Sequence, residues 1–185
     1  QKLMPTTEGG LDFKLNMTHM LDGYPGIEHS LPIFPLYKDL TKTLAASKTA
    51  LTPTLIVSYG GPWAENFYYT TESPLHDAKL NHFTPYEELH SKAARRAGSL
   101  GGWFTPEDQV FPKHAQGLKS LVEQDGLVGV GSHGQLQGLG YHWEMWSIGS
   151  GGMKPLDVLK TATIRGATAL GLDKDLGSIE AGKLA

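Results

Sequence analysis

Apolar and polar positions along the chain predict short strands that alternate with helices. Four short segments are typical of strands, and the second has a polar end: residues 3–7, 26–30, 49–57 and 127–133. Five longer segments are predicted to be helices: residues 11–21, 35–47, 112–124, 139–150 and 155–170. This alternation indicates an α/β fold with a parallel sheet and right-handed crossovers. The periodicity alone does not distinguish part of a barrel from an open doubly wound sheet.

One stretch interrupts the alternation. Residues from about 60 to 110 are rich in aromatic residues, His, Pro and Gly, and they predict a long loop excursion. A loop of this length in a compact domain is usually functional or partly disordered.

Composition narrows the classes of protein that the chain can belong to. Its 185 residues suit one domain but fall short of the roughly 250 residues of a complete (β/α)8 barrel. A net charge of −3 argues against a nucleic-acid partner, and the absence of cysteine excludes disulfides and thiolate metal sites. No apolar run approaches the roughly 18 residues of a membrane helix, so we expect no membrane partner and a soluble protein of the cytoplasm or periplasm.

Three polar side chains follow predicted strands and are the candidates for chemistry. Glu8, His29 and His133 stand at strand ends, where βα folds place their active sites. Imidazole and carboxylate are natural ligands of a divalent transition metal, which lowers the pKa of bound water and polarises a carbonyl. The alternative is that these side chains cap strand ends and bond to loop backbone.

The last thirty or so residues carry the strongest resemblance. Residues 155–172 and the Gly-Ser-Ile-Glu-Ala-Gly-Lys stretch at 177–183 are similar to the C-terminal signature of the metal-dependent amidohydrolase superfamily. There a helix pair closes a (β/α)8 barrel. The resemblance implies a partial TIM-like barrel of about strands 5 to 8 with their helices, with residues 1–185 as the C-terminal portion of one barrel domain within a larger enzyme.

The same resemblance assigns the candidate ligands. The segment that ends at His29 resembles strand six of the superfamily, whose terminal His binds metal. In strand eight the usual Asp, a ligand and general base, is replaced by His133. In strand five the usual His-Ala-Glu is Thr6-Thr7-Glu8, which keeps only the glutamate. The implied metal ligands are therefore Glu8, His29 and His133, with His133 also catalytic as the proton shuttle.

Other segments resemble a divergent branch of the superfamily, in which the barrel follows a Tol-B-like β-propeller, as in tricorn-protease-related proteins. These segments are residues 22–32, 52–55, 59–66 and 131–135. Tyr59, Trp63 and Asn66 follow a strand end and are candidates for the substrate wall. His142 is a further substrate-binding candidate, with a packed helix residue as the alternative.

The expected function is hydrolysis of an amide or cyclic amide C–N bond by metal-activated water, with zinc favoured over manganese or iron. The substrate would be a small-molecule amide or a peptide-like compound. The alternative is a non-catalytic barrel module for binding or assembly that has lost its metal ligands. We expect little activity from this chain alone, and a homo-oligomer in which two copies complete a barrel-like sheet.

Overall fold

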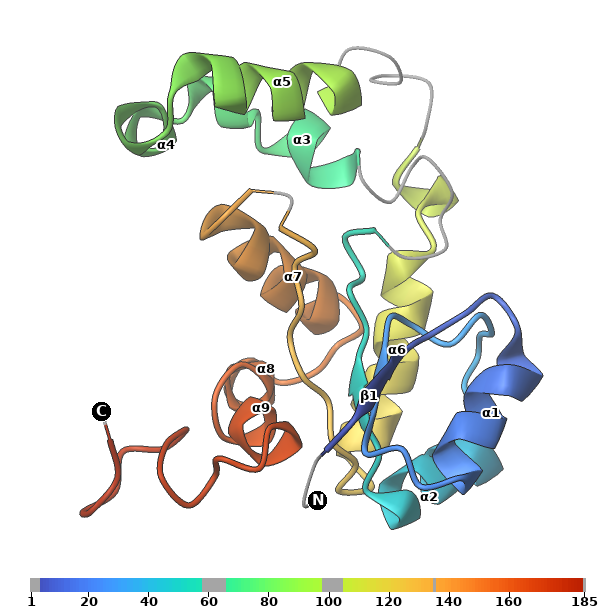
Figure 1. Cartoon of the computed structure of the whole chain (residues 1–185). Coiled ribbons are helices and arrows are strands. Elements are labelled where there is room, and N and C mark those ends of the chain that lie inside the picture. Colours follow the sequence, from blue (N-terminus) through green and yellow to red (C-terminus); the bar gives the residue numbers. More distant parts are fainter. Residues whose placement is uncertain (1–3, 58–65, 98–104, 135, 185) are drawn as a thin grey trace.

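A small parallel sheet organises the chain. The computed structural model describes residues 4–57, 66–97, 105–134 and 136–184. Its strands are hydrogen-bonded in the order β1 (Thr6–Glu8), β2 (Gly26–Glu28) and β3 (Ala50–Thr52), all parallel. The register places Glu8 beside Glu28 and Glu28 beside Thr52, so the three carboxyl ends are level. The predicted parallel α/β fold is confirmed (Figure 1).

The segment predicted as the last strand continues the sheet beyond β3. Leu51 forms a parallel bridge with Val128, donating to the Leu127 carbonyl and accepting from the Gly129 N–H, both at 3.0 Å. Among the described residues this bridge replaces the regular strand expected over 127–133. The backbone is drawn close to β3 here, because a Cβ on Gly131 would lie 2.8 Å from Cγ2 of Thr52.

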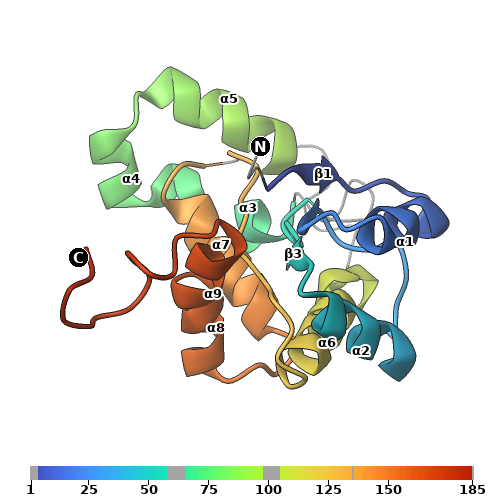
Figure 2. The same ribbon diagram turned by 60° about the horizontal axis from the view of Figure 1, so that its bottom comes forward.

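Helices connect the strands, as parallel pairing requires. The elements around the sheet are α1 (Phe13–Leu21), α2 (Lys38–Ser47), α6 (Phe111–Val122), α7 (Leu139–Gly149), α8 (Pro155–Thr161) and α9 (Ile164–Ala169). Helices α1, α2 and α6 lie on one side of the molecule and α7, α8 and α9 on the other (Figures 1 and 2). The segment predicted as a helix over 155–170 is two helices, because Thr163 has non-helical φ and ψ of −129° and −100°.

The main core lies between the sheet and its covering helices. Ile27, Leu51 and Val128 contribute fully buried side chains from the sheet. Helix α2 contributes Leu44, and α6 contributes Leu121, both completely buried. The apolar faces of these two helices therefore point inward and pack against the sheet.

The predicted loop excursion at about 60–110 is helical over much of its described part. It contains α3 (Phe67–Thr71), η2 (Pro74–His76), α4 (Ala78–Phe83), α5 (Tyr86–Ala97) and η3 (Pro106–Asp108). We call α3 to α5 the helical insert. Most positions of α5 are polar or charged, and its buried side chains in the described part are Leu89 and Ala93, four residues apart. This narrow stripe is why the sequence pattern indicated a loop.

A second core joins the helical insert to the rest of the chain. Its buried members are Ile56, Tyr68, Tyr69, Leu89, Ala93, Leu136 and Trp143. The Trp143 ring stacks on Tyr68 with centroids 5.3 Å apart and planes at 12°. Since Ile56 and Leu136 belong to the connections that follow β3 and the last sheet segment, the insert packs at the carboxyl end of the sheet (Figure 1).

Within the described part, no helix has the length and apolar character needed to cross a membrane.

Candidate functional site

The strand ends bring the three sequence-predicted ligands together. Glu8 ends β1, and His29 follows β2 directly. The Glu8 Oε1 atom lies 2.7 Å from Nε2 of His29, an ion pair when the imidazole is protonated. The His133 ring lies beside His29, with centroids 5.7 Å apart and planes tilted by 59°. We call Glu8, His29 and His133 the strand-end cluster.

Backbone hydrogen bonds set the position of this cluster. The N–H of His29 donates to the Thr52 carbonyl at 2.7 Å, one residue beyond the regular end of the sheet. The N–H of Gly9 donates to the Glu28 carbonyl at 2.8 Å. A side chain on Gly9 would meet that carbonyl, since its Cβ would lie 2.2 Å from the oxygen. The glycine therefore allows β1 to hold Glu8 against β2.

The backbone turns to the left-handed region just after three successive sheet segments. His29 has φ of +69°, Thr54 of +50° and His133 of +55°. This conformation costs roughly 1–2 kcal/mol for an L-residue, and it is rarest for β-branched residues such as threonine. Strained backbone of this kind gathers at functional sites, where it aims side chains that regular strands would direct elsewhere. Glycine and asparagine are the usual signals of this conformation, and neither stands at these three positions, so the sequence did not predict it.

The cluster has the donor chemistry of a zinc site without its complete arrangement. Two imidazoles and a carboxylate are ligands that zinc takes. The His29 side chain is 20% exposed and that of Glu8 is 76% exposed, so the pair lies at the mouth of the sheet. Over residues 4–57, 66–97, 105–134 and 136–184, however, no group of three or more His, Asp, Glu or Cys side chains is arranged to hold a metal ion. Metal binding by the cluster stays a prediction.

Glu28 is a titratable neighbour that the sequence analysis did not select. Partial burial raises its pKa above the ordinary value, while a hydrogen bond with Thr52 and the charge of His29 lower it. The Glu8 carboxylate raises the pKa of Glu28 further. A carboxyl group with a raised pKa beside the cluster can hold a proton at a higher pH than an exposed glutamate. Its signal in the sequence is a charged residue that directly precedes a predicted ligand.

Glu144 on α7 is completely buried and holds the connection that follows β3. Its two carboxylate oxygens accept the backbone N–H groups of Leu55 at 2.7 Å and Ile56 at 2.9 Å. Burial raises the pKa of Glu144 to about 8, although both hydrogen bonds act to lower it. The sequence gives no sign of this role, because the partners of Glu144 are 88 and 89 residues away.

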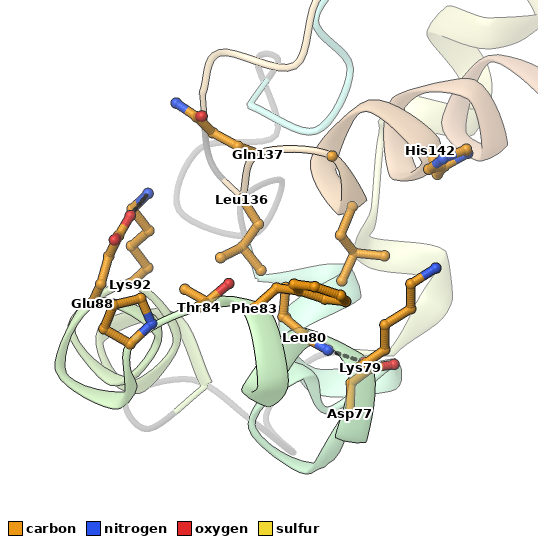
Figure 3. A pocket seen from close by; sticks show the side chains of 13 residues that line it. Asp77, Lys79, Leu80, Phe83, Thr84, Glu88, Lys92, Leu136, Gln137 and His142 are labelled. Atoms are coloured by element: carbon orange, nitrogen blue, oxygen red, sulfur yellow. Dashed lines mark hydrogen bonds and ion pairs between the residues drawn. The ribbon is translucent and has the colours of Figure 1, made fainter.

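The structure describes two of the four predicted substrate-binding residues, Asn66 and His142. Asn66 precedes α3 and is 8% exposed, and its Nδ2 atom has no hydrogen-bond partner among the described residues. His142 is exposed on α7 and lines a pocket between α7 and the helical insert (Figure 3). No member of the strand-end cluster lines that pocket. Tyr59 and Trp63 lie outside the described residues.

Comparisons with known proteins agree with this architecture. The crystal structure of a Xaa-Pro dipeptidase with bound methionine in the active site is similar in fold, with a TM-score of 0.57 and 20% sequence identity. The similarity covers 97% of this chain but 37% of that one, so the chain spans little more than a third of the length of this neighbour. No curated protein matches the sequence.

Comparison with protein families identifies the family as well as the fold. The parallel sheet, its alternating helices and the likeness to the dipeptidase confirm the predicted partial (β/α)8 barrel. The model of the amidohydrolase family matches residues 63–185, which is most of the chain and includes His133 and the C-terminal stretch. This protein belongs to the amidohydrolase family.

Proposed function

We propose that the strand-end cluster is part of the metal centre of a hydrolase that cleaves amide or cyclic amide C–N bonds. The observation that carries the proposal is the contact of Glu8 with His29, with the ring of His133 beside them, at the carboxyl end of a parallel sheet. Barrel folds place catalytic residues at this end. In this proposal residues 1–185 are the C-terminal portion of one barrel domain.

Each residue of the cluster has a distinct part. His29 and Glu8 offer a nitrogen and an oxygen that already meet, and His133 supplies the second imidazole. A divalent ion held there, zinc or else manganese or iron, would lower the pKa of a water molecule toward 7 and polarise the substrate carbonyl. A neutral imidazole has one basic nitrogen, so His133 binds the metal or acts as the base. In the second role the exposed His133 would accept a proton from water and return it to the leaving amine.

The proposed substrate is a small amide or a peptide-like molecule. Membership in the amidohydrolase family supports amide hydrolysis, and the similarity in fold to a dipeptidase supports a peptide-like substrate. We further propose that the chain belongs to the divergent branch fused to Tol-B-like propellers, which the segments around His29 and His133 resemble. A parent polypeptide without a β-propeller upstream of this barrel would exclude that branch.

Metal analysis of the whole 185-residue chain, purified without chelator and supplied with zinc, tests the proposal. We expect about one equivalent of bound metal, because three side chains supply one coordination sphere. His29→Ala and His133→Ala each remove one of the three proposed ligands and should lose the metal. His76→Ala changes an exposed histidine of the helical insert and serves as the matched control, which should keep it.

A second function is favoured by one feature of the cluster. Within the described residues the side chains are not arranged as a three-ligand metal site, and Glu8 contacts His29 directly. This arrangement suits a non-catalytic barrel module for binding or assembly. Less than about 0.2 equivalents of metal in the zinc-supplied chain, with unchanged folding of both histidine variants, would support the module and contradict the metal centre.

A further inference from the structure

A pocket of about 550 Å³ lies between the helical insert and α7 (Figure 3). Its walls are α4 with the Thr84 and Pro85 linker, the first half of α5, and the turn that leads into α7. This turn includes Leu136, three residues after His133, so the pocket lies on the same side of the molecule as the carboxyl end of the sheet. Its volume falls within the roughly 300–1,000 Å³ of small-molecule sites.

The interior of the pocket is apolar. Leu80, Leu136 and Leu139 line it and also pack in the second core, so the floor of the pocket belongs to the contact between the insert and the rest of the chain. Phe83 forms part of the wall, yet 74% of its surface is exposed. A large exposed aromatic ring beside an apolar floor is a surface that a ligand with an apolar body can cover.

Two carboxylates and two ammonium groups line the rim of the pocket, and they differ in the contacts that they already make. The Asp77 Oδ1 atom accepts the Leu80 N–H at 2.6 Å as the N-cap of α4, and Glu88 pairs with Lys92 at 3.0 Å. Lys79, in contrast, has no ion pair among the described residues. Its side chain extends toward the side of the pocket where His142 lies (Figure 3). Because no carboxylate in the described part of the chain pairs with it, the Lys79 ammonium group can pair with an anionic group on a ligand.

We propose that this pocket binds a small molecule with an apolar body and a single carboxylate. The apolar body covers Phe83, Leu136 and Leu139, and the carboxylate pairs with Lys79, with His142 as a second donor. The pocket is a preformed cavity that shares no lining residue with the strand-end cluster. Binding there needs neither a metal nor catalysis, so the proposal stands or falls independently of the proposed function.

Calorimetric titration of the whole chain with three matched compounds tests this site. The probes are 4-phenylbutanoate, 4-phenylbutan-1-ol and 4-phenylbutylamine, which share one apolar body and differ in charge. We expect the acid to bind about tenfold more tightly than the alcohol, a difference of about 1.4 kcal/mol, because only the acid can form a charge-assisted contact with Lys79. The amine should bind most weakly.

Two exposed positions supply the variants. Lys79→Glu should reverse the order, so that the amine binds best, and Phe83→Ala should weaken all three probes. Lys42→Ala, an exposed lysine of α2, is the matched control and should bind as the unchanged chain does. Lys79 and Phe83 are both exposed, so these variants should keep the fold, which circular dichroism verifies.

The outcomes separate this proposal from the metal centre. His29→Ala should bind 4-phenylbutanoate unchanged, whatever its effect on metal content. Equal binding of the three probes, no binding of the acid, or a Lys79→Glu variant that still prefers the acid would each overturn the proposal.

Discussion

At the scale of single residues, the buried carboxylate of Glu144 fixes backbone that lies outside the sheet. Glu144 satisfies two backbone N–H groups that the turn after β3 leaves without a strand partner. Buried donors without acceptors cost about 1–3 kcal/mol each, so this side chain fixes the course of the connection. The strand-end histidines, in contrast, destabilise the fold locally. Their left-handed backbone adds strain that other contacts of the sheet must offset.

Glu144 should make the stability of the protein depend on pH. The folded protein raises its pKa from 4.5 to about 8, so the folded state binds this proton more tightly than the unfolded state does. The contribution is fully present below pH 4.5 and is lost as the pH rises through 8. Between these values we expect Glu144 to remove a few kcal/mol of the free energy of unfolding.

Urea unfolding of the Glu144→Gln variant at pH 5.5 and pH 9 measures this effect. The glutamine keeps one acceptor but turns its NH2 group toward a second backbone N–H, so we expect a loss of about 1–3 kcal/mol at pH 5.5 and a flatter pH profile. Glu123→Gln, on the surface of α6's C-terminal end, is the control. A Glu144→Gln profile parallel to that of the unchanged chain would contradict the assignment.

At the scale of elements, the helical insert is attached to the barrel segment by its own small core. Leu89 is completely buried there, whereas five of the nine α5 positions from 86 to 94 are exposed. The pocket proposed for an apolar carboxylate is formed by the same packing, because Leu80, Leu136 and Leu139 belong to both. The insert should therefore be able to loosen without unfolding the main core.

Leu89→Ala should loosen the insert selectively. Removing a buried leucine side chain costs about 2–5 kcal/mol, and that cost falls on the second core. In hydrogen exchange followed by mass spectrometry, peptides of α4 and α5 should exchange faster while those of α6 keep their protection. Leu11→Ala, at a position that is 77% exposed, should change neither. Equal acceleration in α6 would mean that the chain unfolds as one cooperative unit.

At the scale of the whole molecule, the sheet is open. Within the described residues β1 pairs with β2 alone, so its other edge has no strand beside it. Large apolar side chains are also exposed on α8 and the residues after it: Leu156, Leu159, Leu170, Leu172, Ile179 and Leu184. Open edges and exposed apolar patches both favour association with another surface.

We expect this chain to self-associate at micromolar concentration, as light scattering would show by a mass above that of one copy. A double variant, Leu170→Lys with Ile179→Lys, removes exposed apolar surface from the C-terminal part without touching the sheet. Association that persists in it would support pairing through sheet edges, and association that disappears would place the contact at the C-terminal part. A monodisperse monomer of the unchanged chain would contradict the prediction.

Much of this organisation could be predicted from the sequence. The order of strands and helices follows from local apolar spacing, which each segment carries independently of the others. Glu8, His29 and His133 could be predicted to meet, since the carboxyl ends of parallel strands lie at one edge of a sheet. The helical insert could not be predicted from the sequence, because its apolar stripe is short. The stripe is recognised as a packing surface only once Trp143 and Tyr69 are seen in the same core.

The sequence by itself determined the parallel α/β order and the position of three polar side chains at its strand ends. The tertiary structure alone decided the clamp of Glu144 on Leu55 and Ile56, the left-handed turns at His29 and His133, and the pocket beside His142. The physical reason is the separation along the sequence of the groups that interact. Periodicity is encoded within a dozen residues, whereas these features depend on groups that are distant in sequence and become neighbours only when the chain is packed.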